Sequence, residues 1–202
     1  MTNLALTWHR RSRTRGFTLT ELAMVLGIIG IIIGAIWSAA SSVYQNRNTS
    51  NAVQQLTMLV GRVRAMYPNG YVPASGQFTN FLIEANAAPG MIRPCTIGTA
   101  QFPDAGATVN GQCLVTPWGN QISVGSGMGW GGETASPSHF AFVVWGMPNT
   151  QAVALVAGML PATAAGLDWV YCDSGGAQNV TSSTAPTAFS ACAGSVVFDF
   201  TF

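Results

Sequence analysis

Arg15-Gly16-Phe17-Thr18-Leu19-Thr20-Glu21 leads directly into the apolar run Leu22–Trp37, and this stretch decides how the rest of the chain is organised. All charged residues before it are arginines, and after Glu21 no charged residue follows until Arg47. As a helix, residues 22–43 would span about 33 Å, which matches a hydrocarbon core of about 30 Å. The sequence therefore predicts a helix that can cross a membrane.

Glu21 is the one acidic residue at the edge of this apolar run. A charge at the centre of a membrane helix costs about 2.5–3.5 kcal/mol, and the cost is smaller at the rim. If the helix packs among other apolar helices, Glu21 needs a positive partner, and no side chain of this segment provides one. A cut after Gly16 would provide it, because it exposes the α-amine of Phe17 in the same subunit or in a neighbour.

Gly16, Phe17 and Glu21, in register with the basic leader and the apolar run, resemble the class III signal of type IV prepilins. The resemblance implies that a membrane-embedded prepilin peptidase cuts after Gly16 on the cytoplasmic side, and that the Phe17 amine is then N-methylated. It also implies that Glu21 pairs with the Phe17 amine of an adjoining subunit and sets the assembly register. The alternative is an ordinary signal anchor with an incidental Glu21.

Three glycines, Gly27, Gly30 and Gly34, interrupt the apolar run. Small residues permit close helix approach, and each glycine weakens a helix by up to about 1 kcal/mol. In pilins, similar glycines lie where the helix can loosen during assembly. Packing and loosening therefore remain two open explanations for these positions.

Composition limits the possible classes of function. Only 7% of the residues are charged, against about 25% in typical soluble domains. Four of the eight arginines precede Gly16, which favours a cytoplasmic N-terminus by the positive-inside rule. Beyond Gly16, four arginines stand against seven acidic residues, so no basic footprint for nucleic acid is evident. A length of 202 residues fits one globular domain with an appended segment.

Cys95, Cys113, Cys172 and Cys192 all lie downstream of the predicted span. An even number of cysteines on the exported side of a membrane indicates disulfides. Separations of 18 and 20 residues favour Cys95–Cys113 and Cys172–Cys192, although four cysteines allow three pairings. A metal site is disfavoured because there is neither a Cys-x-x-Cys motif nor a nearby histidine.

The chain divides into a leader (1–16), a transmembrane or filament-core helix (17–45), an amphipathic helical half (46–67) and a globular head (68–202). We expect one continuous helix from residue 17 to about residue 66, because no proline occurs in it before Pro68. In its second half, apolar residues recur every three or four positions, at Val53, Leu56, Val60, Val63 and Tyr67. This stripe predicts that the helix packs against a sheet formed by the head.

The head itself contains several predicted elements. We expect a short helix around Thr79–Ala88, a helix capped by Asn149 or Thr150 and ended by Pro161, and five strands: Gln112–Thr116, Asn120–Val124, His139–Trp145, Leu167–Cys172 and Ser195–Phe202. The fold class is therefore α+β, with a long N-terminal α-helix whose apolar half protrudes and whose amphipathic half packs on a disulfide-stabilised antiparallel head. Thr116-Pro-Trp-Gly-Asn120 and Phe140–Val144 before a helix resemble segments of type IVb pilins, including the conjugative type.

The residues that could carry chemistry also have simpler interpretations. His139 begins an apolar strand, while Asp168, Asp173 and Asp199 lie on strands or at their ends, where turn and surface roles are common. Gly125–Gly132 is glycine-rich but lacks the lysine and the following helix of a phosphate-binding loop. We therefore expect no enzyme, no cofactor and no metal.

The resemblance implies a major pilin, the repeating subunit of a type IV pilus. Such a protein waits in the bacterial inner membrane, single-pass with its N-terminus in the cytoplasm, until the assembly machinery of that membrane adds it to an extracellular homopolymer. The filament would support adhesion, conjugation or motility. One alternative is a minor pilin or a type II secretion pseudopilin. Another is a membrane-anchored binding module that never polymerises and keeps Met1.

Overall fold

A computed structural model of the chain describes residues 16–72, 77–100, 102–126, 136–173, 176–179, 189 and 192–202. The leader residues 1–15 and most of the glycine-rich segment, residues 127–132, lie outside this description. The chain forms two compact units, Met1–Tyr44 and Gln45–Phe202, which we describe separately. Helix α1, Leu19–Met66, contributes residues to both.

The second half of α1 carries the predicted apolar stripe. Leu56, Val60 and Val63 are buried, and Val53 and Tyr67 pack partly buried against the same core. Ala52 and Leu59 are also buried and widen the stripe beyond the predicted positions. The helix runs unbroken to Met66 because no proline interrupts it before Pro68, which confirms the predicted end.

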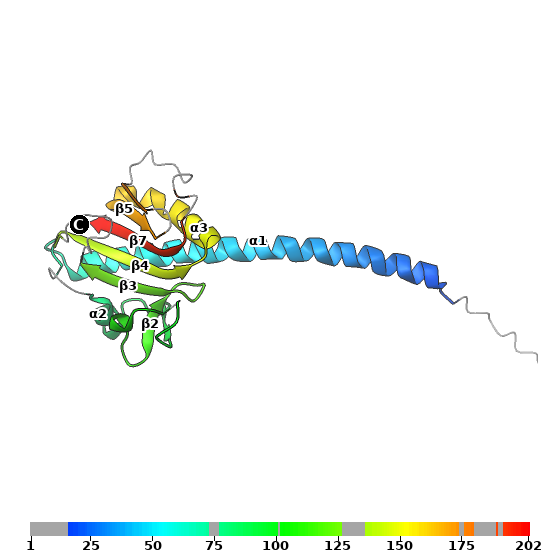
Figure 1. The fold of residues 1–202 in the computed structure, drawn as a ribbon, viewed down its shortest axis with the longest axis horizontal. Coiled ribbons are helices and arrows are strands. Elements are labelled where there is room, and N and C mark those ends of the chain that lie inside the picture. The colour runs from blue at the N-terminus through cyan, green and yellow to red at the C-terminus, as the bar shows by residue number, and fades with distance from the viewer. Residues whose placement is uncertain are drawn as a thin grey trace, which may run out of the picture. The chain divides into compact units, whose positions relative to one another are not determined.

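The rest of the second unit is built on one antiparallel sheet with the order β1-β2-β3-β4-β7-β5-β6, which Figure 1 shows laid across this half of α1. The strands are β1 (Ile92–Pro94), β2 (Gln112–Val115), β3 (Gln121–Ser126), β4 (His139–Met147), β5 (Leu167–Cys172), β6 (Gly176–Asn179) and β7 (Gly194–Thr201). The central pair, β4 and β7, aligns His139 with Thr201 and Val144 with Val196. All five predicted strands are therefore present, and the predicted α+β fold is confirmed.

Successive side chains of the central strands point alternately to the two faces of the sheet. Phe140, Phe142, Phe198 and Phe200 are fully buried in the core that includes the α1 stripe. The rings of Phe140 and Phe200 stack with their centroids 5.5 Å apart. Aromatic pairs of this kind add about 0.5–1.5 kcal/mol beyond their burial. The phenylalanines of β4 and β7 thus fix the sheet on the helix.

Two predicted helices differ from the structure at their ends. Helix α2 covers only Thr79–Glu84, because the chain reverses through Asn86, whose φ is 48°. Helix α3 (Asn149–Met159) begins after Pro148, whose extended backbone forms the N-cap, so the predicted capping by Asn149 or Thr150 is wrong. The predicted end before Pro161 agrees with the structure to one residue: α3 ends at Met159, and Pro161 lies in the first turn of the 3₁₀ segment Leu160–Ala165 that follows.

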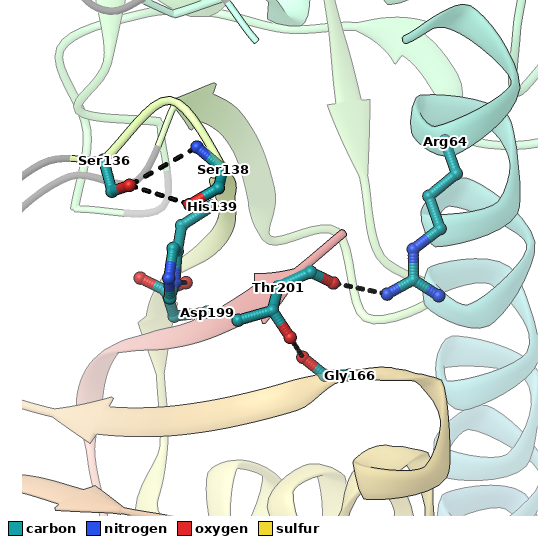
Figure 2. Close-up of polar contacts among 7 residues, drawn as sticks. All are labelled: Arg64, Ser136, Ser138, His139, Gly166, Asp199 and Thr201. Carbon is teal, nitrogen blue, oxygen red and sulfur yellow. Dashed lines mark hydrogen bonds and ion pairs between the residues drawn. The ribbon is translucent and has the colours of Figure 1, made fainter. Parts of the chain in front are cut away.

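Arg64 joins the end of α1 to two distant segments of the second unit. Its Nη2 atom donates to the carbonyl oxygens of Ala165, at 2.6 Å, and Thr201, at 2.5 Å, and Figure 2 shows the second of these bonds. Its guanidinium carbon also lies 5.9 Å from the centre of the Phe140 ring. The described residues contain no acidic partner for it, so two carbonyls and an aromatic face stabilise the charge.

We expect Arg64→Met to lower the free energy of unfolding by about 1–3 kcal/mol, because the carbonyls of Ala165 and Thr201 lose a charged donor. Denaturant unfolding of the detergent-solubilised chain measures the change. Arg62→Met is the matched control, because Arg62 is exposed on the same helix. The control should remain within about 0.5 kcal/mol of the wild type. Equal stability of the two variants would contradict the role assigned to Arg64.

Gly158 of α3 lies against the side chain of Val53 of α1. A Cβ atom at this position would come within 2.6 Å of Val53 Cγ2. Valine is stiff about χ1, so it cannot swing out of the way freely. The glycine therefore permits an approach that any larger residue would prevent.

We expect Gly158→Val to destabilise the protein by about 1–3 kcal/mol, the usual cost of overpacking. Gly61→Val provides the control, because nothing lies within 4 Å of a Cβ at this α1 glycine. Thermal unfolding of both variants compares them. A Gly158→Val protein no less stable than the Gly61→Val protein would show that the α1–α3 approach is not tight.

Candidate functional site

The first unit contains the segment that the sequence singled out. In α1, the apolar side chains from Leu19 to Tyr44 are exposed, with Trp37 at 78% of its full accessible surface. Phe17, just before the helix, is 84% exposed. By length and composition, α1 is the one helix among the described residues that is long and apolar enough to cross a membrane. An exposed surface of this size is expected to meet lipid or other apolar helices.

Glu21 lies at the start of this surface and takes part in a local hydrogen-bond motif. Its Oε2 atom accepts bonds from the backbone nitrogen of Thr18, at 2.8 Å, and from Thr18 Oγ1, at 2.9 Å. The Glu21 nitrogen in turn donates to Thr18 Oγ1 at 3.3 Å. This reciprocal pattern is a capping box, which satisfies backbone donors at a helix N-terminus.

The capping box was not among the expectations, although its signal is present in the sequence. Thr18-Leu19-Thr20-Glu21 has a threonine followed three residues later by a glutamate, directly before an apolar run. Thr18 thus provides Glu21 with neutral donors inside the chain. A positive partner for Glu21 is still required if water is removed from around it.

The three glycines of the apolar run face open space in the part of the chain that the structure describes. A Cβ atom built on Gly27, Gly30 or Gly34 would meet nothing within 4 Å. Packing among the described residues therefore does not require glycine at these positions. Close packing against another molecule and loosening of the helix both remain consistent with them.

Both disulfides are formed within the second unit. Cys95 bonds to Cys113, with 5.8 Å between the Cα atoms, and Cys172 bonds to Cys192, with 5.2 Å. This is the pairing that the sequence separations favoured. The first bond ties the segment after β1 to β2, and the second ties the end of β5 to the segment before β7.

His139 and Asp199 lie close together on the neighbouring strands β4 and β7. Figure 2 shows the imidazole directed at the carboxylate, with 3.1 Å between His139 Nδ1 and Asp199 Oδ1. The hydroxyls of Ser136 and Ser138, close by, bond to each other at 2.8 Å. A serine hydrolase requires a serine bonded to the histidine. The arrangement is that of a cross-strand polar pair beside a serine turn.

The other acidic residues also have structural positions. Asp173 accepts a hydrogen bond from the Ser195 nitrogen at 2.9 Å, next to the Cys172–Cys192 bond. Asp168 lies in β5 beside the turn at Gly166. Within the described ranges, no three histidine, cysteine or acidic residues are grouped so as to hold a metal ion.

Comparisons with known proteins find a sequence motif in the N-terminal segment and a solved structure with a similar fold. Residues 11–37 match the family model of the prokaryotic N-terminal methylation motif. The crystal structure of a type IVb pilin from Salmonella typhi is similar, with 18% identity and a TM-score of 0.53, over 76% of this chain and 99% of that one. TcpA, a type IV pilin from Vibrio cholerae El Tor, is 15% identical over 76% of this chain and 98% of that one, with a TM-score of 0.46, too low to indicate a shared fold. No curated protein sequence matches significantly.

Proposed function

We propose that this chain, in which an N-terminal methylation motif precedes a type IV pilin fold, is the major structural subunit of a type IV pilus. Prepilin peptidase cuts it after Gly16, and the new Phe17 amine is methylated. Until assembly, the protein is held in the bacterial inner membrane by α1, with its N-terminus in the cytoplasm and its head outside. The assembly machinery of that membrane then adds it to an extracellular homopolymer.

The observation that carries this proposal is the exposed apolar surface of α1, most of which lies within the matched motif at residues 11–37. Side chains such as Ile31 and Ile33 are 76% and 58% exposed, and no described residue of the first unit covers them. A single anchor in lipid would explain the apolar character but not the Gly16-Phe17 junction or the position of Glu21. Packing of these helices against one another in a fibre explains all three features.

The three features act together in the proposed filament. Removing apolar surface from water contributes about 25 cal/mol per Å², so contacts between helices supply cohesion without selecting one register. Glu21 selects the register because its carboxylate, once surrounded by apolar side chains, needs the charged Phe17 amine of a neighbour. Contacts that relate successive subunits without closing produce an open fibre.

Shearing fibres from cells that express the chain and measuring their subunit composition tests this proposal. A major pilin should be the principal protein of the fibres. A minor pilin or a pseudopilin should be a small fraction of them, and its deletion should leave fibres of another subunit. Detection of the chain only as an uncut membrane protein would favour the anchored binding module.

A further inference from the structure

A groove runs along the second half of α1, between this helix and two loops of the head. It consists of two adjoining cavities of about 280 and 200 Å³, which share Gln55 and Gly90 in their walls. The opposite wall is formed by residues 87–91 and 115–117. The α1 side chains that line it follow one face of the helix: Asn51, Gln55, Met58, Leu59 and Arg62. The whole groove lies within the unit Gln45–Phe202.

The two ends of the groove differ in polarity, but both carry positive charge. The larger cavity has apolar walls that include Met58, which is 63% exposed, and Arg62 at its rim. The smaller cavity is mainly polar and is lined by Arg93. Among the described residues, no acidic residue lines either cavity. The groove therefore favours an occupant with an apolar side chain and a carboxylate.

The size of the larger cavity limits what that occupant can be. Pockets for cofactors and drug-sized ligands usually measure about 300–1,000 Å³, and this cavity lies just below that range. It can instead hold one large side chain of a protein. An apolar cavity with a cation at its edge is the environment that suits an aromatic residue next to an acid.

Helix α2 presents such a pair on the surface of the same unit. Phe81 is 58% exposed, one of the few large apolar residues of the second unit that are not covered, and Glu84 is exposed as well. The two residues are three positions apart on a helix, so their side chains lie on the same face. Neither Glu84 nor Arg62 has an ion-pair partner in the described part of the chain.

We propose that the groove receives Phe81 and Glu84 of a second copy of this chain. The Phe81 ring enters the apolar cavity against Met58, and the Glu84 carboxylate pairs with Arg62. In each copy the groove is filled by one neighbour and α2 binds the groove of another, so the contact is head-to-tail and can continue from copy to copy along an open fibre. The contact lies between heads and adds to the contact between apolar helices; it rests on the proposed function.

Charge reversal tests the pairing in the full chain. Arg62→Glu and Glu84→Arg should each lower the yield of sheared fibres by about tenfold or more, since like charges at an interface are strongly unfavourable. The double variant should restore most of the yield. Arg47→Glu is the matched control, because Arg47 is exposed on the same helix outside the groove. Its fibre yield should not change.

The outcomes distinguish a failure of the groove contact from a failure of the proposed pilin function. If wild-type cells make fibres and the single reversals assemble normally, the groove contact is wrong and the pilin function stands. A double variant as defective as the single variants also contradicts the contact. If the wild-type chain forms no fibres, both proposals fail. Levels of each variant in the membrane fraction show whether a defect arises from misfolding.

Cysteine cross-linking provides a second test that does not depend on charge. The described cysteines are all in disulfides, so Met58→Cys and Phe81→Cys together introduce the free thiols. Mild oxidation of fibres with both substitutions should give a ladder of covalent multimers, whereas either substitution alone should give none. A dimer band without a ladder would show a closed pair, and absence of any cross-link would show that the residues are not in contact; both results contradict the proposal.

Discussion

Glu21→Val is expected to abolish fibre assembly while the protein is still inserted in the membrane and cut after Gly16. The variant keeps the apolar surface of α1, and it removes the only carboxylate near the new Phe17 amine. A buried charge left without its partner costs about 3–5 kcal/mol, and the amine would carry this cost at every step of assembly. We expect fibre yield to fall well over tenfold, measured by shearing and immunoblotting.

Glu21→Gln separates the charge of Glu21 from its role in the capping box. Glutamine can also accept the hydrogen bonds of Thr18, so it keeps the helix start but lacks the charge. The account predicts that this variant assembles as poorly as Glu21→Val. If Glu21→Gln cells make normal fibres and Glu21→Val cells do not, Glu21 acts through capping and the proposed ion pair is wrong.

Replacing Cys172 and Cys192 by serine is expected to lower the free energy of unfolding by about 2–5 kcal/mol, the usual effect of losing a native disulfide. Both cysteines are almost fully buried in the main core, at 1% and 0% exposure. The serines would therefore also bury hydroxyl groups among apolar side chains. Because domains are stable by only about 5–15 kcal/mol, this loss should leave a large unfolded fraction on mild heating.

The Cys95→Ser/Cys113→Ser double variant is the comparison for this prediction. The Cys95–Cys113 bond that this variant loses closes a loop of 18 residues, and the Cys172–Cys192 bond closes one of 20. The loss of either bond should therefore have a nearly equal entropic effect on the unfolded chain. Cys95 is only partly buried, which makes its replacement less costly. Denaturant unfolding of the oxidised proteins should rank the Cys172/Cys192 variant as the less stable. The reverse order would contradict the importance assigned to burial.

The elements that could be predicted from sequence are those with a long, regular signal. The stripe from Val53 to Tyr67 recurs over several helical turns, and the run from Phe140 to Val144 is continuous. Strands β1 and β6 were missed because each has only three or four residues, with proline or glycine and no periodicity. The start of α3 was misplaced because Pro148 provides the cap through its backbone conformation, which a search for a capping side chain does not detect.

The candidate functional residues also divide into those that the sequence alone could indicate and those that only the folded structure brings together. Gly16, Phe17 and Glu21 could be singled out because a lone charge beside an apolar run is visible in the sequence. The groove could not be predicted, because it depends on residues 51–62 and 87–91 meeting in the folded head. The glycine at position 158 likewise acquires its role only where α3 meets Val53.

The central claim is that a cut after Gly16 creates the amine on which assembly depends. Mass spectrometry of the mature N-terminus, measured on isolated fibres, tests it most directly. The account predicts a chain that begins at Phe17 with a methylated α-amine. A chain that keeps Met1, or that begins at any residue other than Phe17, would contradict it.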